Sequence, residues 1–261
     1  MLTISRPGRY LFAIALIAFG IIQFLIAGFL SSLFPIPDSL PARKIVLYIV
    51  SALFILSGAG IIVFKENKAA LTAGLVLLLL LIYPHLFSLL KNLHNGGEWA
   101  VFGETAAFCG GAFILAEQVT GRKTDPAGGS RFWSASMKAG PLFFGIALLI
   151  FGVQHFLYAK YIATLIPHWI PFPLFWSYFV GVAFIAGAAS ILLKIRTRLA
   201  SSLLGFMFLF WVIFVHAPRV MANPHTETEW TSLFVAMGFC GIFFTLAGNS
   251  GLVNKSRKEN A

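Results

Sequence analysis

The chain has 261 residues, of which 59% are hydrophobic and 11% are charged, and its mean hydropathy is +0.87. This composition excludes a water-soluble domain and predicts a protein that lives in a lipid bilayer. The net charge of +10 does not predict a nucleic-acid partner, because the Lys and Arg residues lie between apolar runs instead of clustering on a soluble domain.

Eight apolar runs are long enough to cross a membrane, since spanning about 30 Å of hydrocarbon takes roughly 20 apolar residues in a helix. In chain order they cover residues 10–30, 45–64, 69–90, 99–118, 139–158, 174–193, 199–217 and 230–248. Arg6 and Arg9 before the first run also fit a secretory signal peptide. This run has a counterpart in the middle of the chain, however, which favours its retention as a span.

The basic residues predict the orientation of the spans. With both termini in the cytoplasm, 14 of the 19 Lys and Arg residues lie in segments on the cytoplasmic side. The remaining five lie outside: Arg43, Lys44, Lys91, Lys160 and Arg219. Such a bias follows the positive-inside rule, so we expect a multi-pass protein with both termini in the cytoplasm.

The chain resembles itself at an offset of 131 or 132 residues. The stretch "ALIAFGIIQFLIAGFLSSLFP" from Ala15 aligns with "ALLIFGVQHFLYAKYIATLIP" from Ala147, and Cys109 later aligns with Cys240. Because four spans return the chain to the side on which it began, both copies have the same orientation. We therefore predict an all-α integral membrane protein, with eight transmembrane helices arranged as two parallel-repeat four-helix bundles. The first repeat covers 1–120, a cytoplasmic linker covers 121–138, and the second repeat with a short cytoplasmic tail covers 139–261.

One polar motif recurs toward the end of each repeat. It reads "HLFSLLKNLHNGGEW" from His85 and "HAPRVMANPHTETEW" from His216, with His, Asn, His, Glu and Trp at the same spacing. The closing Trp suits the membrane interface, where an indole ring is favoured. The Glu of each motif, Glu98 and Glu229, has the spacing of a helix capping box; ligand binding or proton transfer is the alternative.

The His and Asn residues of this motif have three interpretations. They are structural clamps if Pro84 and Pro218 disturb the ends of the third spans and free backbone groups there. They form a quinone or proton site in the second interpretation, and a metal site in the third. Glycines in the first copy and a proline in the second argue against a continuous helix through the motif, so we assign no metal site. The residues concerned are His85, Asn92, His94, His216, Asn223 and His225.

The two repeats differ in other polar residues. Gln23 stands in the first repeat where the second has His155, and Ile36 stands where the second has His168. The second repeat is therefore the better candidate for a ligand site. We expect four of its residues to converge at one outer mouth: His155, His168, His216 and His225.

Glu104 also occurs in one repeat alone, since Val235 stands at the equivalent position of the other. It lies about one turn inside the fourth predicted span. An ionised carboxylate is costly in hydrocarbon, so this position indicates a polar partner or a carboxyl group that stays protonated. A location close enough to the interface to reach water is the alternative.

The second repeat carries an ordered set of elements: "FGVQHFLYAKYIATLIPHWIPFP", then "YFVGVAFIAGAASILL", then a basic "KIRTR". This order resembles the DoxX/DoxD-like family of small four-helix membrane proteins, and the first repeat looks like a more diverged copy. The residues that carry the resemblance are Gly152, His155, Phe156, Pro167, Pro171, Pro173 and Gly181.

The resemblance implies a four-helix bundle for each repeat, in the plasma (inner) membrane of a prokaryote. It also implies a link to quinone chemistry, because the founding relatives belong to a thiosulfate:quinone oxidoreductase. Many relatives carry an acidic residue in the second span, shortly after the glycine that is here Gly181. This chain has Phe184 there and Phe54 in the first repeat, which weakens any mechanism built on that carboxylate.

We expect an accessory subunit of a quinone-linked membrane redox system, with a His-bearing site on its outer face. Quinone is the expected ligand, and membrane redox proteins are the expected partners. The sequence has no recognisable nucleotide, flavin or haem motif, and without a cofactor the chain cannot move electrons alone. A small-solute transporter and a membrane scaffold without a ligand are the alternatives. The first candidates for contacts are His155, His168, His216, Asn223 and His225, and the second are His85, Asn92, His94, Glu98, Glu104 and Glu229.

Overall fold

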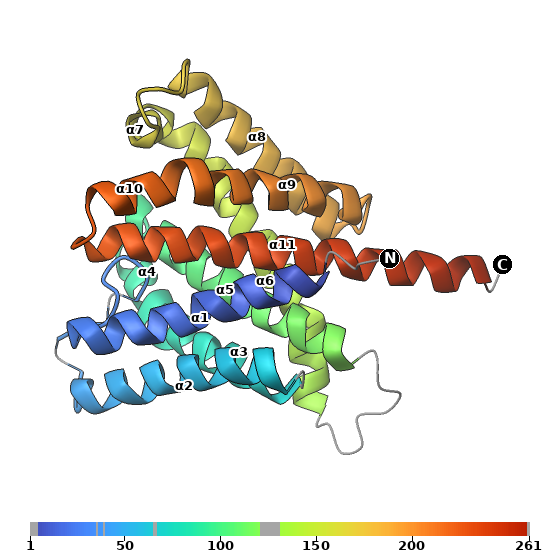
Figure 1. The fold of residues 1–261 in the computed structure, drawn as a ribbon, viewed down its shortest axis with the longest axis horizontal. Helices are drawn as coiled ribbons and strands as arrows, with labels where there is room; N and C mark the ends of the chain where they lie inside the picture. The colour runs from blue at the N-terminus through green and yellow to red at the C-terminus, as the bar shows by residue number, and fades with distance from the viewer. Residues whose placement is uncertain (1–4, 35, 39, 65–66, 121–130, 260–261) are drawn as a thin grey trace.

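The computed structural model of the chain describes residues 5–34, 36–38, 40–64, 67–120 and 131–259 (Figure 1). Eight helical segments in this part of the chain are long and apolar enough to span a membrane, which confirms the number of predicted spans. No strand occurs among the described residues. The elements are α1 (Ser5–Ile26), α2 (Arg43–Val63), α3 (Asn67–Leu80), η1 (Leu81–Leu86), α4 (Phe87–Lys91), α5 (Gly96–Thr120), α6 (Arg131–Leu157), α7 (Ala159–Leu165), α8 (Pro173–Leu192), α9 (Thr197–Trp211), η2 (Val212–His216), α10 (Ala217–Ala222) and α11 (Glu227–Glu259).

The first span is shorter than the sequence predicts. We expected it to reach residue 30, but α1 ends at Ile26, and Ala27 takes a left-handed conformation with φ of 49°. The Gly28 N–H then donates to the Gln23 carbonyl at 3.3 Å, which is the closing bond of a Schellman motif. The chain therefore leaves the helix axis about one turn earlier than its apolar run suggests.

The third span of each predicted repeat contains a π-helical segment close to a proline. Pro84 lies inside η1, and η2 ends two residues before Pro218. A proline offers no N–H to the carbonyl four residues earlier, and a π turn shifts the hydrogen-bond register around such a gap. The prediction that these prolines disturb both spans is confirmed. As a consequence, His85 and His216 both lie in irregular turns.

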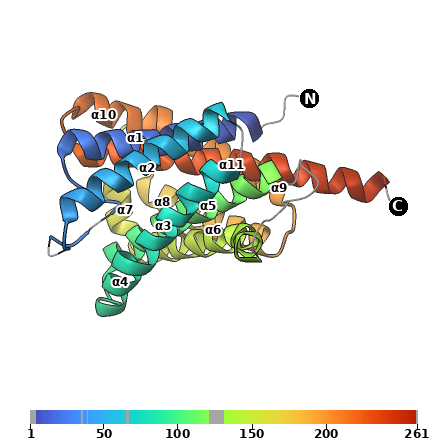
Figure 2. The same cartoon turned by 90° about the horizontal axis from the view of Figure 1, so that it is seen from below.

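Helices α5 and α11 form the centre of the array. They contact each other, and in addition α5 packs against α6 and α11 packs against α1. The remaining neighbours follow chain order: α1 with α2, α2 with α3, α3 with α5, α6 with α8, α8 with α9, and α9 with α11. Figures 1 and 2 show the fourth span of each predicted repeat beside the first span of the other. The contacts of α5 with α6 and of α1 with α11 therefore join the two predicted repeats.

Ring contacts in this array recur at an offset of 131 or 132 residues. Phe12 of α1 stacks on Phe108 of α5 at a centroid distance of 5.6 Å. Phe144 of α6 contacts Phe239 of α11 at 5.8 Å. The two central rings, Phe108 and Phe239, meet at 5.9 Å. The centre of the array is therefore filled by aromatic side chains.

The paired cysteines make equivalent contacts as well. The Cys109 thiol lies 3.5 Å from the Gly74 carbonyl oxygen, and the Cys240 thiol lies 3.4 Å from the Gly205 carbonyl oxygen. Both cysteines are buried and free. They pack as small hydrophobic residues with a weak S–H donor.

The contacts of α1 with α11 and of α5 with α6 bring helix backbones together at glycines. A Cβ on Gly241 would lie 2.6 Å from the Gly8 carbonyl oxygen, and a Cβ on Gly110 would lie 2.6 Å from the Gly140 carbonyl oxygen. Any larger residue would force these helices apart. Small residues serve this purpose in membrane proteins, where close packing is the main attraction between helices.

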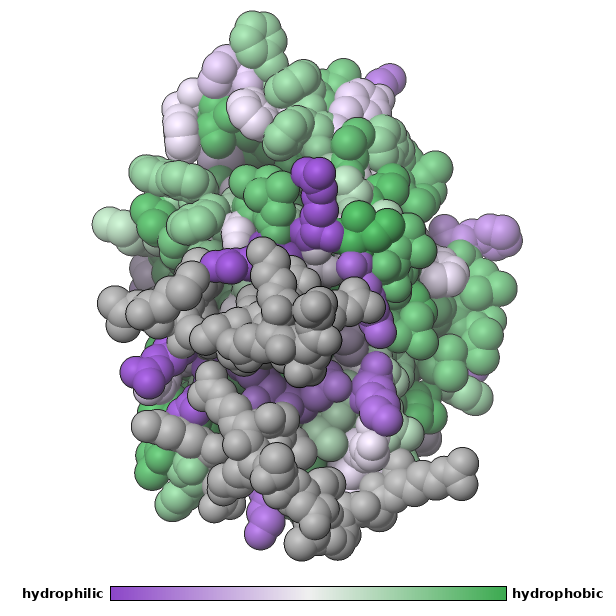
Figure 3. Space-filling view, turned by 90° about the vertical axis from the view of Figure 1, so that its right-hand side faces the viewer, coloured by the Kyte–Doolittle hydropathy of each residue, from purple (hydrophilic) through white to green (hydrophobic). Residues whose placement is uncertain are grey.

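The beginning of α1 and the end of α11 lie at the same end of the array, together with the α8–α9 turn (Figure 1). Residues 121–130 of the predicted linker lie outside the described residues, whereas residues 131–138 form the first turns of α6. Figure 3 views this end and shows hydrophilic side chains gathered among apolar ones. The helix ends here carry the basic residues Arg6, Lys68, Lys138, Lys194, Arg196 and Arg198.

Candidate functional site

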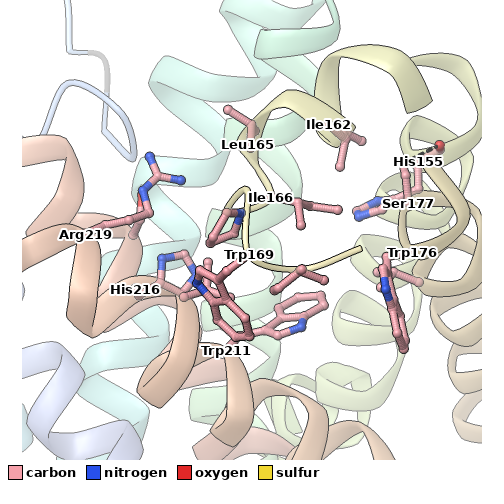
Figure 4. A pocket seen from close by; sticks show the side chains of 15 residues that line it. His155, Ile162, Leu165, Ile166, Trp169, Trp176, Ser177, Trp211, His216 and Arg219 are labelled. Atoms are coloured by element: carbon pink, nitrogen blue, oxygen red, sulfur yellow. Dashed lines mark hydrogen bonds between the residues drawn. The ribbon is translucent and has the colours of Figure 1, made fainter. Parts of the chain in front are cut away.

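A cavity of about 500 Å³ lies between α6, α7, α8, η2 and α11, at the end of the array opposite the described chain ends (Figure 4). Three indole rings line it, and aliphatic side chains of α7 and the following connection cover much of the remaining wall. Trp169 is 64% exposed, so the cavity has an open rim. The polar residues in its wall are His155, Ser177, His216, Arg219 and Ser232.

A second cavity, of about 200 Å³, adjoins the first and extends toward the centre of the array. The two cavities share His155, Trp211, His216 and Ser232 in their walls. We therefore treat them as one site with an outer chamber of about 500 Å³ and an inner chamber of about 200 Å³. Glu104 is among the residues that line the inner chamber.

Four phenylalanine rings form a closed circle around the inner chamber. Their centroids lie 6.1 Å apart between Phe151 and Phe184, 5.9 Å between Phe184 and Phe208, 5.1 Å between Phe208 and Phe239, and 5.8 Å between Phe239 and Phe151. Trp211 contacts Phe208 at 4.8 Å. Walls of this kind favour a flat ring, which they contact by stacking or by edge-to-face packing.

His155 lies in the last turn of α6, and its Nδ1 is 2.8 Å from the Phe151 carbonyl oxygen. Because a carbonyl oxygen only accepts, Nδ1 carries the proton and donates it to this bond. Nε2 of the neutral ring is then an acceptor. The imidazole also packs edge-on against Phe184 at 5.2 Å. The site therefore offers a ligand a hydrogen-bond acceptor that is held in place.

His216 ends η2 on the opposite wall of the outer chamber (Figure 4). Its Nδ1 is buried and has no hydrogen-bond partner among the described residues. About one turn later, Arg219 donates from Nε and Nη2 to the Glu229 carboxylate, at 2.8 and 2.9 Å. This ion pair holds Arg219 in the wall of the outer chamber, and Nδ1 of His216 stays buried and unsatisfied by the described residues.

Glu104 belongs to α5 of the first predicted repeat, yet it lines the inner chamber in the second. Its carboxyl group makes no hydrogen bond or ion pair within the described part of the chain. A polar group in apolar surroundings is costly without a hydrogen-bond partner. The polar partner that the sequence offers as one alternative for Glu104 is therefore not among the described residues.

The equivalent space in the first repeat is filled. Phe34 is fully buried, and its ring lies 6.4 Å from Phe19, 5.5 Å from Phe54 and 6.2 Å from His85. Ile166 stands at the equivalent position of the second repeat, where it lines the outer chamber. Phe34 thus fills the space in the first predicted repeat. The smaller Ile166, at the equivalent position, leaves the chamber of the second predicted repeat open.

His85 and Gln23 lie inside the closed repeat. His85 is buried, with Nε2 at 3.1 Å from the Thr105 hydroxyl, which is a side-chain partner and not one of the backbone groups that the structural-clamp interpretation names. Gln23 takes the place that His155 has in the other repeat; it is buried, and neither side-chain amide atom has a partner in the described residues. The open chambers lie in the repeat that the sequence favours as the candidate.

Several candidate residues lie outside both chambers. The expectation that His168 and His225 converge with His155 and His216 is not met. Pro167 and Trp169 take the positions in the wall, and His168 between them is left at the surface. The exposed candidates that line neither chamber are Asn92, His94, His168, Asn223 and His225.

The recurrent Glu and Trp residues of the motif have mainly structural contacts. Glu229 binds Arg219. The Thr226 N–H donates to the Asn223 carbonyl at 3.1 Å instead of to Glu229, so the capping-box interpretation is wrong for this residue. The Trp99 indole N–H donates to the Leu93 carbonyl at 2.9 Å, and the Trp230 indole N–H donates to the carbonyl six residues before it at 2.8 Å. Each Trp therefore fastens the loop that precedes its own helix. Glu98 lines neither chamber.

Among the residues of the site that sequence reasoning missed are Trp211, Arg219 and Ser232. Each differs in chemistry from its counterpart in the first repeat. A position-by-position comparison of the repeats, of the kind that singled out Glu104, is the signal that finds them. The counterparts at an offset of 131 are Leu80, Ser88 and Val101.

No group of three or more His, Cys, Asp or Glu side chains that could hold a metal ion occurs in the part of the chain that the structure describes. No family model, no curated protein and no solved structure matches the chain. The geometry and chemistry of the two chambers therefore carry the functional interpretation.

Proposed function

We propose that the chain is a membrane protein that binds a quinone-type headgroup in its second repeat. The observation that carries this proposal is the pair His155 and His216, which lie in opposite walls of an aromatic site, each with a ring nitrogen that no described residue binds. A quinone headgroup is a flat ring with an oxygen at each end. It therefore combines ring packing with hydrogen bonds to imidazole.

The two chambers suit a ligand with a polar head and an apolar tail. The inner chamber of about 200 Å³ has the phenylalanine circle and Glu104, and it shares His155, His216 and Ser232 with the outer chamber, so it takes the headgroup. The outer chamber of about 500 Å³ lies within the roughly 300–1,000 Å³ common for small-molecule sites. Its aliphatic wall, with Ile162 and Leu165, takes the start of an isoprenoid tail, which leaves past Trp169 toward lipid.

The protein would act as an accessory subunit of a quinone-linked membrane redox system. The resemblance to the DoxX/DoxD-like family supports this role. In this arrangement the chain supplies the binding site, and a partner membrane protein exchanges electrons with the ligand. The residues of the chain bind and orient the ring and exclude water from it.

The proposal includes two parallel DoxX-like repeats in a prokaryotic plasma membrane, with both termini in the cytoplasm. The recurrence of the Phe12–Phe108 contact as Phe144–Phe239 supports the duplication. The basic residues at the end where α1 begins and α11 ends support the orientation, because cytoplasmic segments are rich in Lys and Arg. The chambers then open at the outer interface.

A small-solute transporter would need a polar path between the repeats. Phe108 and Phe239 meet there at 5.9 Å, and the helix contacts beside them are made by glycines. These observations favour ligand binding over transport. A scaffold without a ligand remains an outcome of the binding test.

Fluorescence titration of the full chain in detergent micelles tests the proposal, with a short-chain benzoquinone as the probe. Because Trp211 lines both chambers, we expect saturable quenching of Trp emission. His216→Ala removes one hydrogen bond to the ligand and should weaken binding about ten-fold. His225→Ala is the matched control, because this exposed histidine lies outside both chambers; its affinity should equal that of the wild type.

Two results would contradict the proposal. If the wild type shows no saturable quenching, the site does not bind a quinone, and the scaffold alternative is favoured. If His155→Ala and His216→Ala both bind as tightly as His225→Ala, the ligand does not contact the two histidines.

A further inference from the structure

We infer that the site binds the reduced, quinol form of its ligand in preference to the quinone, and that Glu104 contacts one of the two quinol hydroxyl groups. The inference rests on the proposed function and specifies the redox form that the site selects. The two forms differ in hydrogen bonding: the oxygens of a quinone only accept, whereas each hydroxyl of a quinol also donates.

His155 is the first group that discriminates between the forms. Its Nδ1 proton is committed to the Phe151 carbonyl oxygen at 2.8 Å, so Nε2 of the neutral ring faces a ligand without a proton of its own. A quinol hydroxyl donates to this nitrogen. A quinone carbonyl would instead bring two acceptors together, and neither would be satisfied.

Glu104 is the second such group. It lines the inner chamber, and its carboxyl group has no polar partner within the described residues. When this carboxyl group is ionised, both of its oxygens only accept hydrogen bonds. In a chamber walled by phenylalanine rings, an unmet acceptor is costly. The second hydroxyl of a quinol satisfies it.

The other polar groups of the inner chamber are compatible with this assignment. The Ser232 hydroxyl both donates and accepts, and the two nitrogens of a neutral His216 ring provide one donor and one acceptor. The Trp211 indole N–H only donates, and a quinol oxygen accepts from it as readily as a quinone oxygen does. Arg219 belongs to the outer chamber and is paired with Glu229. The groups that separate the two redox forms are thus His155 and an ionised Glu104.

With this assignment, residues of both predicted repeats form the binding site. In the first repeat Phe34 fills the space equivalent to the inner chamber, but this repeat contributes Glu104. The second repeat has the chambers and the histidines, and at the position equivalent to Glu104 it has Val235, which is also in the wall of the inner chamber. The two copies therefore take different parts in one binding site.

Calorimetric titration of the full chain under nitrogen tests the inference, with a short-chain benzoquinone and its quinol as the two probes. The wild type should bind the quinol about ten-fold more tightly, or more, because the quinone leaves buried acceptors unmet. Glu104→Val introduces the residue of the other repeat. It should weaken quinol binding about ten-fold and change quinone binding little.

Two further variants separate hydrogen bonding from packing. Glu104→Gln keeps an acceptor and adds an N–H donor, so it should strengthen quinone binding relative to quinol binding. The ratio of quinol affinity to quinone affinity should therefore fall. Glu98→Gln is the matched control, because Glu98 lies on the same helix but lines neither chamber. The control should keep the wild-type preference.

The outcomes are distinguishable. A wild type that binds the quinone as tightly as the quinol, or more tightly, overturns the inference and leaves the proposed function standing. A Glu104→Val variant with the wild-type preference overturns the role of Glu104, and its unchanged quinone affinity would show that the site is intact. If the wild type binds neither probe, the proposed function fails and the inference fails with it.

Discussion

Phe34 is expected to be the residue that closes the first repeat, and replacing it with Ala should be strongly destabilising. The side chain is fully buried, with ring contacts to Phe54 at 5.5 Å and to Phe19 at 6.4 Å. Truncating a buried Phe to Ala costs about 3–5 kcal/mol, because lost packing adds to the cost of the cavity that remains. We expect the free energy of unfolding to fall by about this amount, as measured by denaturant titration in detergent micelles.

The matched control is Ile166→Ala, at the equivalent position of the second repeat. Ile166 is half-buried and lines a chamber that is already open, so its truncation removes fewer contacts. Its cost should be about 1–2 kcal/mol, below the range for a fully enclosed residue. If Phe34→Ala costs no more than Ile166→Ala, the reasoning that Phe34 fills the space left open in the other repeat is refuted.

Two further changes test the packing around the site. Gly241→Ala would place a Cβ 2.6 Å from the Gly8 carbonyl oxygen and 2.6 Å from the Phe12 nitrogen; we expect a loss of about 1–3 kcal/mol from overpacking, and a melting curve like that of the wild type would contradict the close approach. Arg219→Leu leaves the Glu229 carboxylate, which is 13% exposed, without its ion-pair partner and should cost about 1–3 kcal/mol. Adding Glu229→Gln should recover part of that loss, whereas additive losses in a double-mutant cycle would show that the pair is not coupled.

The spans could be predicted because lipid contact is recorded locally in the sequence. A helix in hydrocarbon needs an unbroken apolar run of a given length, and charged or polar residues mark its ends. The disturbed third spans were predictable for a similar reason, since Pro84 and Pro218 lack a backbone N–H in any context. The early end of α1 was not, because Ala27 carries the left-handed turn that is usually marked by a glycine.

The candidate site was predictable in part. His155 and His216 were selected by comparing the repeats: Gln23 stands where the second repeat has His155, and His85 stands where it has His216. Both His155 and His216 line the chambers. His168 and His225 were selected for their place in the predicted topology. That topology places a residue at one end of the array without saying whether it lies in the wall of a cavity or at the surface, and both residues are exposed.

By itself, the sequence determined the number of apolar runs long enough to span a membrane, its similarity to itself at an offset of 131 or 132 residues, and the polar differences at aligned positions, such as Gln23 against His155 and Val235 against Glu104. Only the tertiary structure decided which repeat is hollow and which residues face the hollow. A chamber is the volume that side chains distant in the chain leave unfilled, and hydropathy along one dimension does not record that volume. Phe34 and Ile166 are both apolar, yet one is enclosed in the core and the other lines an open chamber.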